Sequence, residues 1–289
     1  MFAVSARELE NVRTRLIDLS GGKVALQFNP ARAVSSGAAV DAMSIKSRLC
    51  FLCAPNLPVG QKAVLNRDNY LILCNPAPIF QNHFTLSHIK HRPQEINASL
   101  NDLLMFAKDL SDEYFVFYNG PACGASAPDH LHFQAVPKDS LPFISEIFAS
   151  SPSEEKAQFK YYAGERWGRP VLILSGRKIG RIINEFSRLT NITRNVLAAK
   201  SEPMMNVICA RENNTWQLII FLRRKHRPDA FFLESEKRIF VSPGAIDMAG
   251  VIITPREIDF QRLDSAVITD IYREVSLSDE KIRQIMNKL

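Results

Sequence analysis

The residues with the clearest potential for chemistry form one segment, Gly124-Ala-Ser126-Ala-Pro128-Asp129-His130-Leu-His132-Phe-Gln134, called the histidine segment below. Apolar, strand-like residues run into it over 114–118 and out of it over 131–136, and a glycine- and proline-containing loop joins them. Side chains alternate faces along a strand, so His130, His132 and Gln134 are expected in one row, with the residues between them in the core.

Three neutral, hydrogen-bonding side chains beside a loop of small residues suit the handling of a phosphate group. Backbone N–H groups around Gly124 and the Ser126 hydroxyl can hold phosphate oxygens, and an imidazole can attack phosphorus. A carbonyl of the loop 124–128 is expected to fix the tautomer of His132. Histidines on the polar face of an amphipathic strand are also common on ordinary surfaces, so the HxH pattern alone is not specific.

The complete string of small loop, Ser, Pro, His-apolar-His-apolar-Gln and Pro resembles the histidine-triad superfamily. It resembles the branch whose last triad member is Gln, which contains galactose-1-phosphate uridylyltransferase, diadenosine tetraphosphate phosphorylase and GDP-galactose phosphorylase. The resemblance covers residues 23–140 with specific motifs and 200–265 only as fold. It implies catalytic roles for His132, Gln134 and His130, and it implies substrate contacts by Ser126, Gly124, Asn119, Asn75 and Arg32. Asn75 and the Asn29-Pro30 turn before Arg32 are equally compatible with plain turns.

The resemblance implies nucleotidyl transfer through a covalent nucleotidyl-histidine on His132. Gln134 has no proton to give, so it cannot act as a general acid for a poor leaving group. We therefore expect a nucleotidyltransferase or phosphorylase whose partners are a nucleotide sugar or dinucleoside polyphosphate and a phosphate or sugar-phosphate acceptor. The alternatives are a hydrolase of the same fold and a non-catalytic nucleotide- or RNA-binding module.

One departure from the uridylyltransferase pattern is Asp129, which stands between Pro128 and His130 where that enzyme has histidine directly after proline. The insertion favours the phosphorylase relatives and puts a galactose substrate in doubt. It also weakens the assignment of His130 as a metal ligand.

Cys50-Phe-Leu-Cys53 has a spacing found in redox motifs and in metal half-sites, and it can also arise by coincidence. A zinc site needs two further ligands, for which His91 and His130 are candidates and His88 is an alternative. A very similar Cys-Phe-Leu-Cys segment in the uridylyltransferase implies a structural zinc held by Cys50, Cys53, His91 and His130. The competing interpretation is that the cysteines only pack in the core.

Composition is that of an ordinary globular protein: 289 residues, 46% hydrophobic and 23% charged, with no apolar run of membrane-spanning length and no signal-peptide pattern. Five cysteines without a disulfide-type scaffold indicate the cytoplasm. The net charge of +6 fits polyphosphate substrates as well as nucleic acid, and we expect neither nucleic-acid nor membrane partners. The family resemblance suggests a homodimer.

The pattern of elements predicts an α+β protein of two histidine-triad-like halves, with antiparallel sheets flanked by helices. Lys225-His226-Arg227-Pro228 repeats Lys90-His91-Arg92-Pro93, and 239–256 parallels 114–138, with Gly250 at the place of His132 and Ile252 at that of Gln134. The second copy is therefore expected to keep the fold without the chemistry. We divide the chain into 1–40 (a helix over 6–19, then a substrate-site strand and loop), 41–150 (the catalytic half) and 151–289 (the degenerate half with C-terminal helices).

Overall fold

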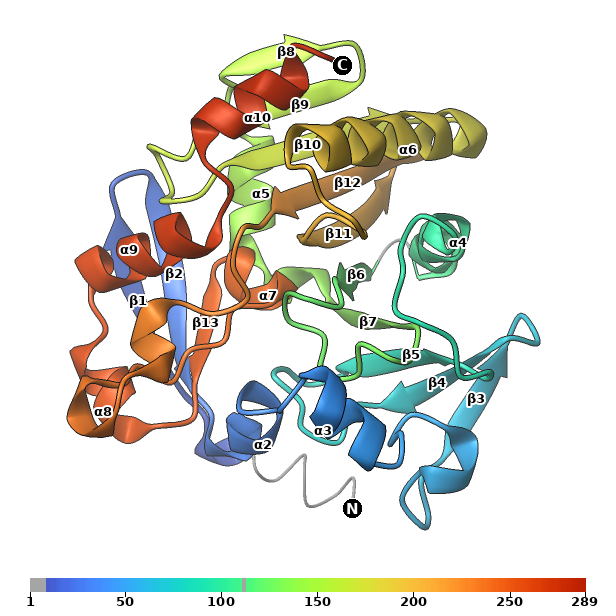
Figure 1. Ribbon diagram of the computed structural model, residues 1–289, viewed down its shortest axis with the longest axis vertical. Coiled ribbons are helices and arrows are strands. Elements are labelled where there is room, and N and C mark those ends of the chain that lie inside the picture. The colour runs from blue at the N-terminus through green and yellow to red at the C-terminus, as the bar shows by residue number, and fades with distance from the viewer. Residues whose placement is uncertain (1–8, 111–112) are drawn as a thin grey trace.

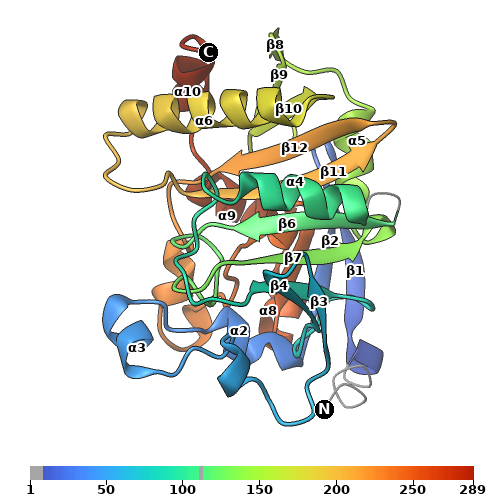
Figure 2. The ribbon, with the colours of Figure 1, turned by 90° about the vertical axis from the view of Figure 1, so that its right-hand side faces the viewer.

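A ten-stranded antiparallel sheet forms the centre of the protein (Figures 1 and 2). The structure is a computed structural model that describes residues 9–110 and 113–289. Across the sheet, the strands lie in the order β3 (Ala63–Asn66), β4 (Tyr70–Cys74), β5 (Phe84–His88), β7 (His132–Pro137), β6 (Tyr114–Asn119), β11 (Met205–Glu212), β12 (Thr215–Leu222), β10 (Val171–Gly176), β9 (Phe159–Tyr162) and β8 (Glu154–Lys156).

The strand order is the same in both halves of the sheet when each is followed inward from its outer edge. The first half runs β3-β4-β5-β7-β6 with helix α4 (Leu100–Asp109) between β5 and β6 in the chain. The second half runs β8-β9-β10-β12-β11 with α6 (Ile179–Val196) between β10 and β11. The halves join where β6 pairs antiparallel with β11, with Phe117 opposite Ile208. The predicted two-half α+β architecture is confirmed.

The residue-by-residue correspondence expected between the halves is wrong. By strand order, β11 and β12 correspond to β6 and β7, whereas aligning the two Lys-His-Arg-Pro segments would place the strands before them, β5 and β12, opposite each other. Residues 251–254, expected to mirror β7, form β13 (Val251–Thr254) and pair in parallel with β2 in a separate sheet. A four-residue repeat and alternating apolar residues are compatible with several strand alignments, because the pattern of a strand repeats every two residues.

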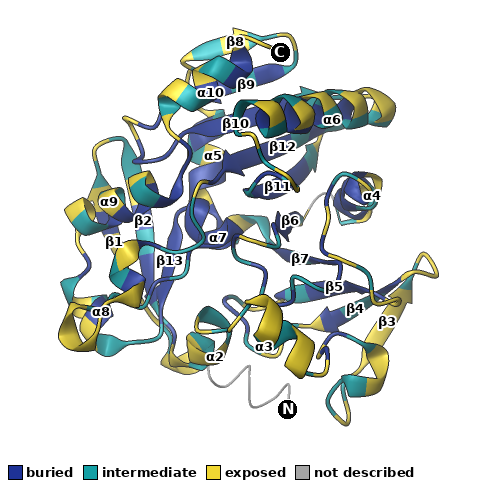
Figure 3. Ribbon diagram, viewed as in Figure 1, coloured by how far each residue is buried: buried dark blue, intermediate teal, exposed yellow. Residues whose placement is uncertain are grey.

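Helices cover one face of the large sheet, and a small sheet with further helices covers the other (Figures 1 and 3). Helices α4, α6 and α10 (Asp279–Met286) pack on the first face through one apolar core. Strand β6 contributes to both cores, since Val116 and Tyr118 face these helices while Phe115 and Phe117 face the opposite layer. That layer holds β1 (Arg13–Leu19), β2 (Gly22–Phe28), β13, α5 (Pro142–Phe148), α7 (Ala245–Met248), α8 (Glu257–Arg262) and α9 (Ser265–Val275).

The N-terminal helix predicted over 6–19 is wrong for the residues that the structure describes; residues 6–8 lie outside them. Arg13–Leu19 is strand β1, which pairs with β2 across a turn at Ser20 and Gly21. A helix over 6–19 would place Leu16 on its apolar face, but in the structure that side chain is 63% exposed, whereas Ile17 is buried. The hairpin register, in which alternate residues face the core, explains both side chains.

Helix α4 begins at Leu100, and Ser278 caps α10 by accepting a hydrogen bond from the Lys281 N–H. Two short helices, α2 (Ala33–Ser36) and α3 (Ala42–Ser47), follow β2 in the chain. Within the described residues, no helix combines the length and apolar character that crossing a membrane requires.

Candidate active site

A cavity of about 380 Å³ lies at the face of the large sheet that carries His132 and Gln134. Strand β7 presents these two side chains on the same face because they are two residues apart. The cavity brings together seven of the residues predicted from the sequence to act in catalysis or substrate binding: Arg32, Asn75, Asn119, Gly124, Ser126, His132 and Gln134.

His132 is held by hydrogen bonds on its backbone and on one ring nitrogen. Its N–H donates to the Gln94 side-chain oxygen (2.8 Å), and the Gln94 amide donates to the His132 carbonyl (3.0 Å). Nδ1 donates to the carbonyl oxygen of His130 at 2.8 Å, so this carbonyl, and not one from 124–128, fixes the tautomer. The hydrogen on Nδ1 leaves Nε2 with its lone pair.

Burial lowers the pKa of His132 to about 4, although the hydrogen bond to the His130 carbonyl opposes the shift. The imidazole is therefore neutral near pH 7. No hydrogen bond joins Nε2 to any described residue, and His132 lines the cavity. A neutral imidazole with a free Nε2 at a cavity wall has the lone pair that a nucleophile or a base requires.

Gln134 is oriented by His83, a residue to which the sequence analysis assigned no site role. The Ile79 N–H donates to His83 Nδ1 (3.2 Å), so the ring hydrogen is on Nε2, which donates to the Gln134 side-chain oxygen at 2.8 Å. The Asn75 amide also approaches that oxygen, at 3.4 Å. Because the oxygen faces two donors, the amide nitrogen of Gln134 is the atom left for the cavity. Burial, with a contribution from the nearby Arg32 charge, lowers the pKa of His83 to about 3, so the ring stays neutral.

The loop between β6 and β7 is anchored to the second half of the protein. The Asn119 side-chain oxygen accepts hydrogen bonds from Asn206 (2.9 Å) and from the Ala245 N–H (2.8 Å). Gly124 has a φ of +105°, and a Cβ there would come within 2.8 Å of the Gly244 Cα. Glycine is thus required by both conformation and close approach. Asn119 has its oxygen engaged in this joint, while Ser126 lines the cavity half-buried.

Arg32 and Asn75 also line the cavity. Arg32 donates to the Ala77 carbonyl at 2.7 Å, and Asn75 accepts from the Ala77 N–H at 3.0 Å and donates to Thr85 at 3.1 Å. Burial lowers the pKa of Arg32 to about 10, and the charge of Asp247 partly offsets the shift. The guanidinium therefore remains a cation beside the cavity.

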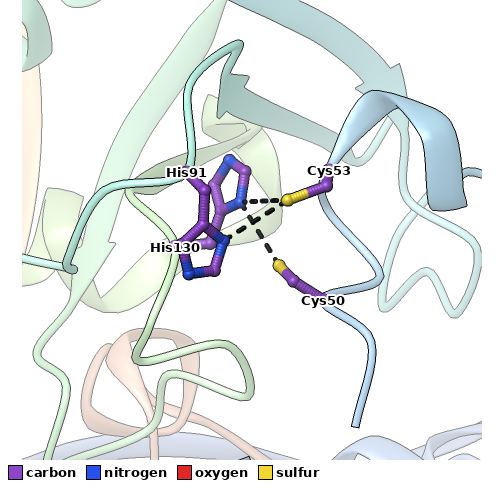
Figure 4. A group of neighbouring side chains, drawn as sticks. All are labelled: Cys50, Cys53, His91 and His130. Carbon is purple, nitrogen blue, oxygen red and sulfur yellow. Dashed lines mark hydrogen bonds between the residues drawn. The ribbon is translucent and has the colours of Figure 1, made fainter. Parts of the chain in front are cut away.

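His130 departs from the expected row of three side chains. It precedes β7, is fully buried, and its ring lies among Cys50, Cys53 and His91 instead of lining the cavity (Figure 4). Its Nδ1 is 3.3 Å from Cys50 Sγ and 3.6 Å from Cys53 Sγ, and Cys53 Sγ is 3.3 Å from His91 Nδ1. The structure thus assembles the four residues predicted as a zinc set, despite the Asp129 insertion.

The geometry of this Cys/His cluster fits a tetrahedral metal. One ligand atom from each residue lies within 4.8 Å of the others, and neighbouring donors in a zinc site are about 3.3–3.8 Å apart. His130 Nε2 donates to the His88 carbonyl at 2.7 Å, which leaves Nδ1 free toward the cysteines as a metal ligand requires. His88 itself accepts from the Lys90 N–H at 3.0 Å and is not part of the cluster.

The second half supplies cavity residues that the sequence analysis left out of the site. These are His226, Arg227, Ser242, Gly244, Ala245, Ile246, Asp247 and Ile253. Burial raises the pKa of Asp247 to about 6, while N–H groups of Gly244 and Ile253 donate to its oxygens at 2.9 and 3.0 Å. A carboxylate isolated in the apolar stretch 245–253 was the available sequence signal for Asp247, and the repeated Lys-His-Arg-Pro was the signal for Arg227.

Known proteins resemble this chain chiefly in fold. A family described as a domain of unknown function (DUF4922) matches residues 3–137, and no curated protein matches the chain. The crystal structure of yeast Ap4A phosphorylase Apa2 superposes with a TM-score of 0.63 at 13% identity, covering 92% of this chain and 90% of that one. The same yeast protein in complex with AMP and with Ap4A gives TM-scores of 0.59 and 0.56 at 15% identity, each covering 95% of this chain and 94% of the other. Over nearly its whole length, this chain therefore has the fold of a yeast Ap4A phosphorylase.

Proposed function

We propose that the protein is a nucleotidyltransferase of the phosphorylase kind, acting on a nucleotide sugar or a dinucleoside polyphosphate. The observation that carries the proposal is His132, neutral and with Nδ1 held by a carbonyl, which leaves Nε2 free at the wall of a cavity beside the Gln134 amide. The fold shared with yeast Ap4A phosphorylase Apa2 supports the same class of reaction. We place this chemistry in residues 41–150.

In the proposed first step, His132 Nε2 attacks the α-phosphorus of the nucleotide donor. A P–N bond forms and the bond from phosphorus to the bridging oxygen breaks, so that the sugar phosphate or nucleoside polyphosphate leaves as an anion without needing a proton. The Gln134 amide donates to a non-bridging oxygen as negative charge builds, and Ser126 with the backbone near Gly124 orients the phosphate. In the second step an acceptor phosphate oxygen attacks phosphorus and the P–N bond breaks, which regenerates the imidazole.

The Cys/His cluster has a structural role in this proposal. Zinc held by Cys50, Cys53, His91 and His130 would fasten the 50–53 loop to the residue whose carbonyl fixes His132. With four protein ligands the metal keeps no open position for substrate. The reaction itself uses the side chains in the cavity.

The test is the intact mass of the purified protein after brief exposure, in separate samples, to UDP-glucose, GDP-mannose, ADP-glucose and diadenosine tetraphosphate. We expect an acid-labile adduct of one nucleoside monophosphate, absent in His132→Ala, whose mass identifies the base. Product analysis with and without orthophosphate then separates phosphorolysis from hydrolysis. Tight nucleotide binding without an adduct from any donor, in folded protein, would instead indicate a binding module.

A further inference from the structure

The strongest unexplained feature of the cavity is a cation contributed by the second half. Arg227 lines the cavity, half-buried, and burial together with the charge of Arg238 lowers its pKa. Among the described residues, no carboxylate lies within ion-pair distance of Arg227; its Nε donates to Ser242 Oγ at 2.9 Å, and Nη2 donates to the carbonyls of Ser36 and Ala38 at 3.0 Å. A partly desolvated cation whose partners are all neutral favours the binding of an anion beside it.

Lys225, in the same Lys-His-Arg-Pro tetrapeptide, shows the ordinary alternative. Its ammonium group pairs with Asp229 at 2.5 Å and with Glu274 at 2.6 Å, away from the cavity. The two cations are only two residues apart but have opposite surroundings. Lys225 contacts two carboxylates, whereas Arg227 contacts neutral acceptors and lines the cavity. The absence of an acid beside Arg227 is therefore a local feature of the cavity wall.

The donors around Arg227 suit an oxyanion. Its Nη1 has no hydrogen-bond partner among the residues that the structure describes, and the Ser242 hydroxyl, which accepts from Nε, keeps its own hydrogen for donation. The ring of Phe231 stacks on the guanidinium, 4.3 Å from the Arg227 Cζ, and limits its movement. A planar guanidinium with free N–H groups beside a hydroxyl matches phosphate geometry.

The buried Arg223 preorganises the two segments that carry these groups. It donates to the carbonyls of Lys225 and His226 at 3.1 Å and to that of Pro243 at 3.0 Å. Residues 225–228 and 242–244 are thereby fixed to each other, so Arg227 and Ser242 do not have to be ordered when a ligand binds.

We propose that Arg227 and Ser242 form a second phosphate subsite, distinct from the place of the α-phosphate at His132 and Gln134. It would bind a phosphate group that belongs either to the donor, as its distal phosphate, or to the acceptor, as orthophosphate. The identity of the ligand rests on the proposed function. The subsite gives the second half of the protein a role in substrate binding although it holds no counterpart of the histidine segment.

The experiment measures equilibrium binding by calorimetry to full-length His132→Ala protein, in which no transfer occurs. The ligands are orthophosphate and the mono- and triphosphates of adenosine, guanosine and uridine. In the same background, Arg227→Gln removes the guanidinium group, and Ser242→Ala removes the hydroxyl while keeping the contacts of Arg227 to Ser36 and Ala38. Lys225→Gln is the matched control. Thermal unfolding of each variant reports folding.

If the subsite takes the distal phosphate, Arg227→Gln lowers triphosphate affinity by about 10- to 100-fold and leaves monophosphate affinity unchanged. Ser242→Ala lowers triphosphate affinity by a smaller factor. If it takes the acceptor, Arg227→Gln abolishes orthophosphate binding to monophosphate-saturated protein. Lys225→Gln changes neither quantity. Equal loss of mono- and triphosphate affinity, or no phosphate binding that depends on Arg227, overturns the proposal.

Failure of the subsite and failure of the proposed function give different results. A His132-dependent adduct in wild-type protein, together with phosphate binding that does not depend on Arg227, refutes only the subsite. Phosphate binding that depends on Arg227, in protein that forms no adduct, refutes only the transferase.

Discussion

The two halves of the large sheet share a strand order but differ in how their innermost strands are connected. In the first half, residues 120–131 link β6 to β7 and contain the histidine segment up to Leu131, while His132 and Gln134 lie on β7 itself. In the second half, β11 passes to β12 through Asn213 and Asn214, which both have positive φ, 48° and 60°, as a tight hairpin requires. The same strand framework therefore carries a long connection in the first half and a two-residue turn in the second.

Histidine content follows the same division. Of the six histidines, His83, His88, His91, His130 and His132 belong to the first half, and only His226 belongs to the second. The second half contributes to the cavity through His226 and Arg227, through the stretch 242–247 that leads into α7, and through Ile253 of β13. The strand that corresponds to β7, which is β12, does not line the cavity. In the function proposed above, one half of the repeat supplies the nucleophile and the other half supplies part of the cavity wall.

The largest effect is expected from matched substitutions in the two halves. His132 lies opposite Ser87 on β5, and Gln217 lies opposite Ser175 on β10. His132→Ala should lower the rate of nucleotidyl transfer by at least about 10⁴-fold because the nucleophile is lost, while Gln217→Ala should leave it within about twofold. Steady-state kinetics with the donor identified by mass measures both. Similar losses in the two variants would contradict the division of roles.

The second largest effect concerns the Cys/His cluster, which the first half alone possesses among the described residues. Cys53→Ser should remove close to one equivalent of zinc and lower the free energy of unfolding by several kcal/mol, because metal binding stabilises only the folded state. Zinc content by mass spectrometry and thermal unfolding measure this. Cys74→Ser, at an exposed cysteine, is the control and should keep the metal. Equal zinc content in both variants would exclude the site.

The stabilisation that the contact between the two halves provides should depend on pH. Glu202 accepts hydrogen bonds from Tyr118 on β6 and from the Ile96 N–H, at 2.6 and 2.7 Å, and burial raises its pKa from the ordinary 4.5 to about 7. Because the folded-state pKa is the higher one, the stabilisation is complete below about pH 4.5 and is lost as pH rises to about 7. Relative to Glu202→Gln, wild-type protein should lose about 3 kcal/mol over this range in denaturant unfolding. A difference that is constant with pH would show that Glu202 is ionised in the folded protein.

The smallest effect separates the role of His83 from simple packing. His83→Phe should lower kcat by about tenfold with little change in KM, because the Gln134 amide loses the donor that sets its direction. In Gln134→Ala protein, the same change at His83 should have no further effect on kcat. Kinetics of the single and double variants form the test, with thermal unfolding as the check on folding. Additive losses would mean that His83 acts independently of Gln134.

Much of the first half was predictable because its signals are local. Strands β4, β5, β6 and β7 follow from short apolar runs bounded by turn residues, and the histidine segment combines residue types that are informative together. The Cys-x-x-Cys spacing indicated the two cysteines of the cluster, and the family resemblance indicated its two histidines. The helix predicted over 6–19 failed because spacings of three and four residues in a short amphipathic segment do not exclude a hairpin.

Residue types and spacing predicted the α+β class and the two halves, which the structure confirms, and they selected the residues proposed to act on phosphate. The tertiary structure alone decided which strands of the halves correspond, that His130 turns to the cysteines while its carbonyl holds His132, and that His83 orients Gln134. It also decided that Arg227 faces the cavity while Lys225 faces two carboxylates. The physical reason is that residue type and spacing fix local conformation, whereas hydrogen-bond partners and burial depend on segments far apart in the chain.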